Sequence, residues 1–253
     1  MNTEAVCLKF GVQQKEGSLP PDMAAVLDLS DIEGTNGYCS SAAQEEITRR
    51  LISRPEGIHF LGNGNYHYVS LFYIRQIRKP FCLIVIDHHT DMQPSFFTEL
   101  LSCGSWIHQA LEELPNLKQV LLFGTAKERV EELGDYDRER VRFFTKERIK
   151  AETEQVYEEA RSLICGKTCY LSIDKDALSE EVVCTNWDQG DMTDEILEQI
   201  VGLIPEEKAD CLGVDICGEY EGRVDKNGPG VTDQEQIRNQ QWNTKWLEKL
   251  KKI

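Results

Sequence analysis

Short apolar runs alternate with amphipathic stretches along the chain. Runs without polar alternation are typical of strands buried on both faces of a parallel sheet, and stretches with one apolar face are typical of helices. We expect strands at residues 5–10, 24–29 (where a short helix is an alternative), 57–61, 81–86, 119–124, 141–144, 168–173 and 211–216, and helices at 41–53, 69–74, 100–114, 127–133, 145–164, from 193 onward and at 232–251. The alternation predicts a three-layer α/β/α fold with a mostly parallel central sheet.

Two helix starts carry recognisable signals. Ser41 is followed three residues later by Gln44, a capping-box pattern that predicts the start of the helix at 41–53. Thr193 precedes two acidic residues, which suit the positive end of a helix. We therefore expect Ser41 and Thr193 to mark helix N-termini.

The strand expected at 81–86 runs directly into a group of ionisable residues. In extended backbone, alternate side chains point the same way, so Asp87, His89 and Asp91 are expected to converge while His88 points away. Charged residues after a strand are usually a solvated loop. Two of the five histidines of the chain lie in this stretch, however, which favours a cation site.

A second strand ends in the same way. Asp174 and Asp176 are expected on one face, with Ser172 behind them and Lys175 pointing the other way. The loop from Gly62 places His67 after another strand. Because ligands bind outside the carboxyl ends of parallel strands, these residues are expected to meet at one edge of the sheet.

Composition limits the number of domains, the partners and the cellular compartment of the protein. With 253 residues and 40% hydrophobic content, the chain is expected to form one domain over residues 1–253. A net charge of −16 disfavours nucleic acid as a partner, and no apolar run has the length of a membrane span. Nine cysteines without a C-x-x-C pair and a start without a secretory signal predict a cytoplasmic protein. A homo-oligomer is compatible with these features.

The motifs resemble those of the arginase/agmatinase/formiminoglutamase (ureohydrolase) family. The family's G-G-x-H-x segment is similar to residues 62–67, its D-A-H-x-D motif to residues 87–91, and its S-x-D-x-D motif to residues 172–176. The resemblance implies a site for two Mn²⁺ ions, with Asp87 and Asp174 shared between them. It places His67 and Asp91 around one ion and His89 and Asp176 around the other. Mixed imidazole and carboxylate ligands suit manganese, and two such ions activate a shared water.

Two departures from the family bear on catalysis. Where arginases have a His-Gly pair that shuttles protons, this chain has Cys103 followed by glycine. Cys103 is a candidate acid, a second nucleophile or an inert small residue. The glutamate that pairs with a guanidinium is shifted from Gly218 to Glu219, or is absent from the site. Loss of that partner makes arginine a poor substrate, because a buried charge would be left unpaired.

The substrate loop also differs from the family pattern. Asn186 and Trp187 stand where the family has residues rich in Gly, Thr and Pro, so they are candidate contacts to a different substrate tail. The resemblance therefore implies a manganese-dependent hydrolase of a non-peptide C–N bond in a small guanidino, amidino or amide compound. Two alternatives are a metal-binding protein without catalysis and a zinc enzyme of the deacetylase type, which shares the fold.

Overall fold

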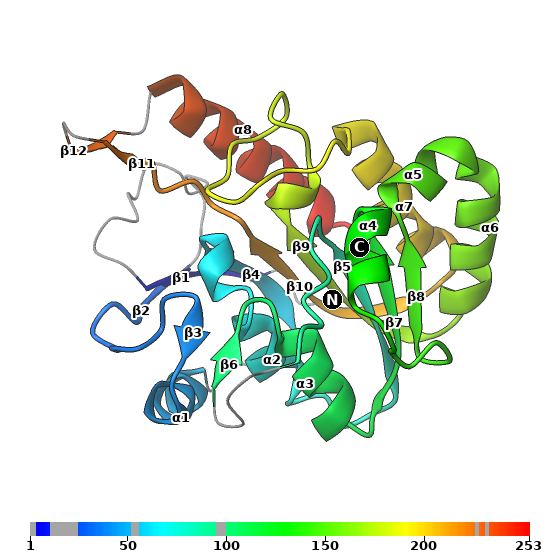
Figure 1. The fold of residues 1–253 in the computed structure, drawn as a ribbon, viewed down its shortest axis with the longest axis horizontal. Coiled ribbons are helices and arrows are strands. Elements are labelled where there is room, and N and C mark those ends of the chain that lie inside the picture. The colour runs from blue at the N-terminus through cyan, green and yellow to red at the C-terminus, as the bar shows by residue number, and fades with distance from the viewer. Residues whose placement is uncertain (1–3, 11–24, 52–55, 95–99, 226–227, 231–232) are drawn as a thin grey trace.

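The structure is a computed structural model. It describes residues 4–10, 25–51, 56–94, 100–225, 228–230 and 233–253. Eight strands form one sheet in the order β2-β1-β4-β10-β9-β5-β7-β8, and every neighbouring pair is parallel (Figure 1). The strands are β1 (Ala5–Lys9), β2 (Ala25–Asp28), β4 (Gly57–Gly62), β5 (Phe81–Ile86), β7 (Leu117–Phe123), β8 (Val141–Phe144), β9 (Thr168–Asp174) and β10 (Asp210–Cys217).

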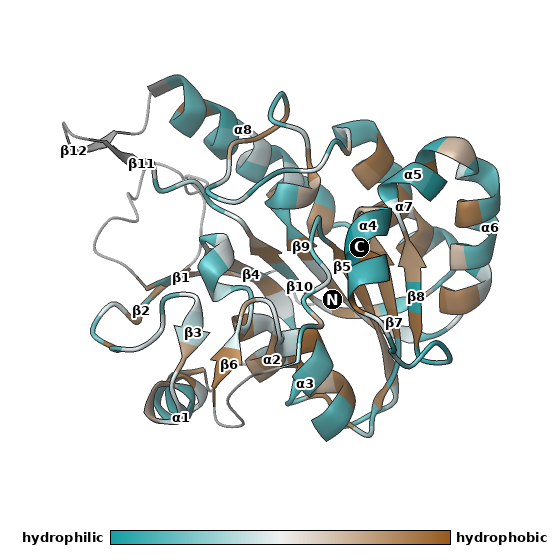
Figure 2. Cartoon of the chain, in the orientation of Figure 1, coloured by the Kyte–Doolittle hydropathy of each residue, from teal (hydrophilic) through white to brown (hydrophobic). Residues whose placement is uncertain are grey.

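Helices cover both faces of this sheet, as predicted. Successive residues of β5 alternate between two cores: Leu83 and Val85 pack on one side, and Ile84 and Ile86 on the other. The first side is covered by α1 (Ser41–Arg50), α2 (Val69–Ile74) and α3 (Trp106–Glu113), and the second by α5 (Lys146–Ala151), α6 (Thr153–Ile164), α7 (Asp194–Glu206) and α8 (Asp233–Leu250). Figure 2 shows apolar strands between helices that are polar on the outside. The predicted three-layer α/β/α architecture is confirmed.

Several predicted elements have other boundaries. Ser40 rather than Ser41 caps α1, because its side chain accepts a hydrogen bond from the backbone of Ala43. Ser53, the predicted end of that helix, lies outside the described residues. The predicted helix 100–114 is instead a two-residue strand, β6 (Leu101–Ser102), followed by α3. The prediction at 145–164 was also wrong in one respect, because α5 and α6 are separate helices there.

Short elements that the sequence did not predict complete the chain. Two are small antiparallel pairs: β3 (Tyr38–Cys39) pairs with β6, and β11 (Arg223–Asp225) pairs with β12 (Gly228–Gly230). The others are the 3₁₀ turns η2 (Gly64–Tyr66) and η3 (Lys175–Ala177). The helix predicted at 127–133 is confirmed as α4 (Lys127–Glu132), which has no buried residue. Both 3₁₀ turns directly follow strands at the carboxyl edge of the sheet, so they can position side chains over that edge.

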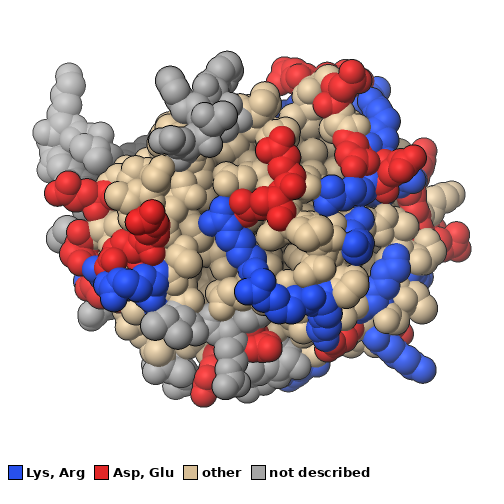
Figure 3. All heavy atoms as spheres, turned by 90° about the horizontal axis from the view of Figure 1, so that it is seen from below, with Lys and Arg blue, Asp and Glu red and all other residues tan. Residues whose placement is uncertain are grey.

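The surface is charged in both signs. On the face shown in Figure 3, acidic and basic side chains are interspersed among the residues drawn in colour. This mixing agrees with many exposed ion pairs, such as those of Glu46 with Arg49 and Arg50. Within the described residues, no helix combines the length and apolar character needed to cross a membrane.

Candidate metal centre

His67 enters the site from the turn after β4. The side chain of Asn63 accepts a hydrogen bond from the backbone of Asn65 at 3.0 Å, which caps η2 and brings His67 over the sheet edge. The Nδ1 atom of His67 lies 2.9 Å from Asp91 Oδ2, 3.2 Å from Asp87 Oδ2 and 3.5 Å from Asp174 Oδ2. One imidazole nitrogen therefore faces three carboxylates that come from two other strand ends.

The segment after β5 supplies three of the predicted ligands. The hydroxyl of Thr125 donates to the backbone carbonyls of Asp87 and His89, at 3.2 and 3.0 Å, and so fixes the chain at this point. Asp91 has a φ of +48°, so the segment is not extended as expected from the alternation. The indole Nε1 of Trp106 donates to Asp91 Oδ2 at 2.7 Å and holds this carboxylate toward the cluster. The predicted convergence is correct, but a turn produces it.

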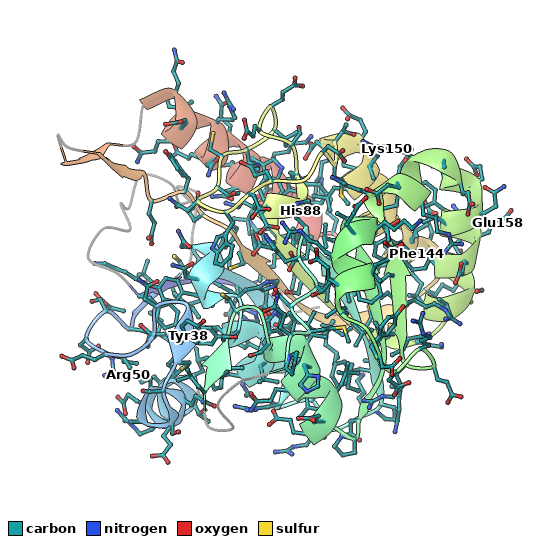
Figure 4. All side chains as sticks on the ribbon, in the orientation of Figure 1. Tyr38, Arg50, His88, Phe144, Lys150 and Glu158 are labelled. Carbon is teal, nitrogen blue, oxygen red and sulfur yellow. The ribbon has the colours of Figure 1, made fainter. Side chains whose placement is uncertain are left out.

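His89 faces the carboxylates of the second half of the cluster. Its Nδ1 lies 2.9 Å from Asp176 Oδ2 and 3.6 Å from Asp87 Oδ1. The turn η3 orders this half, because Asp174 Oδ1 accepts from the backbone N–H of Asp176 at 3.0 Å. The backbone N–H of His88 donates to Asp176 Oδ1 at 3.1 Å, which joins the two strand ends. The side chain of His88, which is labelled in Figure 4, faces Asp188 rather than the cluster carboxylates, as predicted, with its Nε2 3.7 Å from Asp188 Oδ2.

Five of the six predicted ligands thus form two groups. His67, Asp87 and Asp91 offer atoms within 4.8 Å of one another, and so do Asp87, His89 and Asp176. Asp87 belongs to both groups, as the resemblance implied for a shared ligand. Asp174 lies beside His67, and its sharing between two ions stays a prediction.

The electrostatics of the cluster favour bound cations. Oδ2 of Asp87 is buried and faces Nδ1 of His67 at 3.2 Å, without a well-aligned hydrogen bond from the described residues. Burial and the charge of Asp87 raise the pKa of Asp91 to about 6. Burial and the charge of Asp174 raise the pKa of Asp176 as well. Burial opposes protonation of His89, but the neighbouring carboxylates outweigh it and raise its pKa to about 12. The crowded carboxylates therefore favour positive charge in this cluster, which divalent cations would supply in place of protons. The residues fit a metal centre.

A cavity of about 690 Å³ opens above this cluster. Its described lining includes the six ligands and, beyond them, residues of several loops: Asn36, Tyr38, Gln93, Cys103, Arg129, Glu132, Leu133 and Trp187 among others. Cys103 is therefore placed where a substrate would lie. Burial and the charge of Asp91 raise the pKa of the Cys103 thiol to about 12, so the cysteine side chain is neutral near pH 7. A neutral thiol is a weak nucleophile and a weak base.

Glu219 lies in a different place from a substrate-binding glutamate. It is not among the described residues that line the cavity. Its carboxylate forms an ion pair with Lys175 and accepts hydrogen bonds from Asn239 at 3.1 Å and Asn243 at 2.9 Å. Lys175 and Glu219 are 1% and 5% exposed. The structure thus places Glu219 as in the second of the two alternatives, outside the cavity, because its oxygens serve a buried ion pair.

The substrate-loop candidates are also separated by the structure. Trp187 lines the cavity, and its ring meets that of His89 edge to face, with 5.4 Å between the ring centroids. A Cβ atom on Gly64 would lie 2.8 Å from Trp187 Cδ1, so this turn needs a glycine. Asn186 is not among the described lining residues. It accepts hydrogen bonds from Asn63 and from the backbone of Glu221, both at 2.8 Å, and so joins loops beside the cavity.

Other residues support the ligands without having been predicted to do so. Ser172 Oγ is 2.9 Å from Nε2 of His67, and Asp188 Oδ1 is 3.1 Å from Nε2 of His89. The position of Ser172 behind the carboxylates was foreseen from strand period. Asp188, Trp106 and Thr125 were not, because they reach the site from segments with no motif. Together, the fold and the cluster define a three-layer α/β protein with a His/Asp site suited to divalent cations.

Comparison with known proteins identifies the family that has this architecture. A sequence profile of the arginase family matches residues 4–229. An uncharacterised protein of Thermotoga maritima is 36% identical over 212 residues, which are 84% of this chain and 78% of that protein. The chain therefore belongs to the arginase family.

Solved structures show the same fold at low sequence identity. Formimidoylglutamase from Bacillus subtilis is similar with a TM-score of 0.69 and 12% identity, over 98% of this chain and 86% of that one. Proclavaminate amidino hydrolase from Streptomyces clavuligerus is similar with a TM-score of 0.66 and 15% identity, over 98% and 91%. These likenesses confirm the arginase-like fold.

Proposed function

We propose that the protein is a hydrolase that uses two divalent ions, preferentially manganese, to cleave a non-peptide C–N bond. The substrate is a small guanidino, amidino or amide compound other than arginine. One observation carries the proposal: five side chains after β4, β5 and β9 form two ligand groups that share Asp87, with Asp174 beside them, beneath an open cavity.

The donor set supports manganese. The site combines two imidazoles with four carboxylates, and this mixture suits manganese better than calcium or magnesium. Membership of the arginase family supports the same choice. A variant of Trypanosoma cruzi formiminoglutamase, whose structure is described as containing Mn²⁺, is similar to this chain with a TM-score of 0.60 and 14% identity, over 88% of this chain and 73% of that one.

When bound, two such ions lower the pKa of a shared water and supply a nucleophile near neutral pH. The residues of the chain hold and shield the reaction site. Trp106 orients Asp91, Ser172 orients His67, and Trp187 covers His89 from the cavity side. The neutral thiol of Cys103 is a weak hydrogen-bond donor at the cavity wall.

The cavity wall argues against arginine. Outside the ligand set, the acidic residue among the described lining residues is Glu132, which is exposed. The Glu219 carboxylate is occupied by Lys175. A guanidinium placed over the ligands would therefore lack a buried carboxylate partner, which disfavours a strongly cationic reacting group.

The test is turnover by metal-loaded protein. The purified chain is stripped with a chelator, reloaded separately with Mn²⁺, Zn²⁺ or Mg²⁺, and incubated with a panel of amidines, guanidines and amides, while urea and ammonia release are measured. We expect release that requires Mn²⁺ and is lost in Asp87→Asn. The matched control is Asp135→Asn, an exposed acidic position outside the cavity lining. No turnover on any compound with two ions bound would contradict the proposal.

Cys103 favours a second candidate, a metal-binding protein without hydrolytic activity. Its neutral thiol stands where arginases carry a proton-shuttling histidine, so proton transfer to a leaving amine lacks its usual group. The discriminating variant is Cys103→His. If the wild-type chain is inactive and this variant releases urea or ammonia, the non-catalytic candidate is correct for the natural protein.

A further inference from the structure

Residues 184–190 form a loop that reaches over the ligand cluster from β9. Two neighbouring side chains of this loop hold His89. Trp187 packs against the ring edge to face, at an interplanar angle of 74°. Asp188 contacts the ring nitrogen that faces away from the carboxylate cluster, with Oδ1 3.1 Å from Nε2. The orientation of His89 is therefore shared between the cluster and this loop.

Asp188 links its own loop to the segment after β5 and to α4. One carboxylate oxygen faces His89, and the other forms an ion pair with Arg129 of α4 and lies 3.7 Å from Nε2 of His88. Nδ1 of His89 is at the same time directed at Asp176, at 2.9 Å. With a carboxylate at each nitrogen, the ring has one preferred orientation. Its ligand nitrogen faces the cluster and its other N–H donates to Asp188.

The two histidines of the cluster differ in this support. Nε2 of His67 is 2.9 Å from the hydroxyl of Ser172, which is fully buried. The side chain of Asp188 is 61% exposed and belongs to a loop. A carboxylate partner makes an imidazole a stronger metal ligand than a neutral partner does. The loop can thus adjust one half of the centre while the other half is fixed by the core.

We propose that Asp188 is a positioning residue for His89, which makes the affinity of the His89 half of the centre depend on the 184–190 loop. Arg129 restrains Asp188 in the orientation that accepts the His89 N–H. The inference rests on the proposed function only in that His89 binds a cation. Motif comparison does not identify Asp188, since it lies in the segment that departs from the family pattern.

A simple surface ion pair is the alternative explanation for Asp188 and Arg129. Such pairs contribute little to stability and are screened by salt. That explanation predicts that removal of Asp188 changes neither metal affinity nor thermal unfolding. The two explanations therefore differ in a measurable way, because a positioning role changes metal affinity while leaving the fold intact.

The experiment is Mn²⁺ titration of metal-free protein, followed by calorimetry and by electron paramagnetic resonance of free Mn²⁺. We expect two ions per wild-type chain. In Asp188→Ala one of the two dissociation constants should rise about 10–100-fold, the size of effect found when a partner of a ligating histidine is lost. Asp188→Asn should fall between the two, since its amide oxygen can still accept the N–H. The weakened ion is assigned by comparison with His67→Asn and His89→Asn.

Two further variants test whether Arg129 acts through Asp188 and provide a control for the loss of an acidic residue near the loop. Arg129→Gln should weaken the same ion by less, and adding it to Asp188→Ala should cause no further loss, because Arg129 acts through Asp188. Asp191→Asn is the matched control. Asp191 follows the same loop and pairs with Lys150 at 2.6 Å, outside the cavity lining. The Asp191→Asn protein should bind both ions as the wild type does.

The possible outcomes separate this inference from the proposed function. If both dissociation constants are unchanged in Asp188→Ala, the positioning role is refuted and the hydrolase proposal stands. If one ion is weakened as expected but no C–N compound is turned over, the positioning role is supported and the hydrolase proposal fails. If His89→Asn binds metal as tightly as the wild type, His89 is not a ligand and both are refuted.

Discussion

Glu219→Gln tests whether this residue supports the fold or acts on substrate. In the structure its carboxylate neutralises Lys175, which is 1% exposed. The amide would leave a buried ammonium without a counter-charge. Breaking a buried ion pair in this way costs about 3–5 kcal/mol of unfolding free energy. At roughly 2–4 °C per kcal/mol for a domain of this size, the melting temperature should fall by about 6–20 °C.

The assay compares unfolding with turnover. Thermal and urea unfolding are followed by circular dichroism, and the rate is measured per folded molecule at a temperature where the variant remains native. We expect a large loss of stability and a rate close to that of the wild type. Glu181→Gln is the control, because Glu181 is exposed and should change neither quantity. An unchanged melting temperature combined with loss of turnover would refute the reasoning and return Glu219 to a catalytic role.

Replacing both members of the pair sharpens the test. A buried ion pair can often be exchanged for apolar residues at little cost, whereas removing one partner is expensive. Lys175→Met combined with Glu219→Leu should therefore recover part of the stability lost in Glu219→Gln. Recovery is incomplete because Asn239 and Asn243 lose their acceptor. A double variant less stable than Glu219→Gln would show that the charge of Lys175 is not the source of the loss.

Three further predictions concern the ligand cluster. Trp106→Phe removes the donor to Asp91 and should cost about 1.5–3 kcal/mol of unfolding free energy, measured by urea denaturation with metal bound. Gly218→Ala should weaken Mn²⁺ binding in calorimetry, because the added Cβ would lie 2.5 Å from Asp174 Oδ1 and the backbone φ at this position is +87°. Gly134→Ala is the control: φ is also positive there, at +69°, but no atom lies within 4 Å of the added Cβ, so Mn²⁺ should bind normally. In metal-free protein the raised pKa of His89 contributes stability that is complete below pH 6.5 and is lost as the pH rises toward 12. The melting temperature in chelator should therefore fall from pH 6.5 to 9, and His89→Gln should reduce that slope.

Much of the scaffold could be predicted from local pattern. The apolar run of β5 and the largely apolar run of β9 were assigned correctly because both faces of these strands are covered by helices. The boundaries failed where a partner distant in the sequence competes with the local pattern. At 100–114 a helical stretch was expected, but Leu101–Ser102 pairs with Tyr38–Cys39 and delays the helix. A cross-strand partner more than 60 residues away leaves no mark on local periodicity.

The sequence by itself determined the parallel α/β fold and predicted that six candidate ligand residues meet at one sheet edge. It could do so because strand polarity fixes which ends of the strands meet. Only the tertiary structure decided what surrounds those ligands. It directed Glu219 to Lys175 and Asp188 to His89, contacts that join segments far apart in the chain. Such contacts depend on how loops close over the sheet, and no spacing of residue types along the chain encodes that closure.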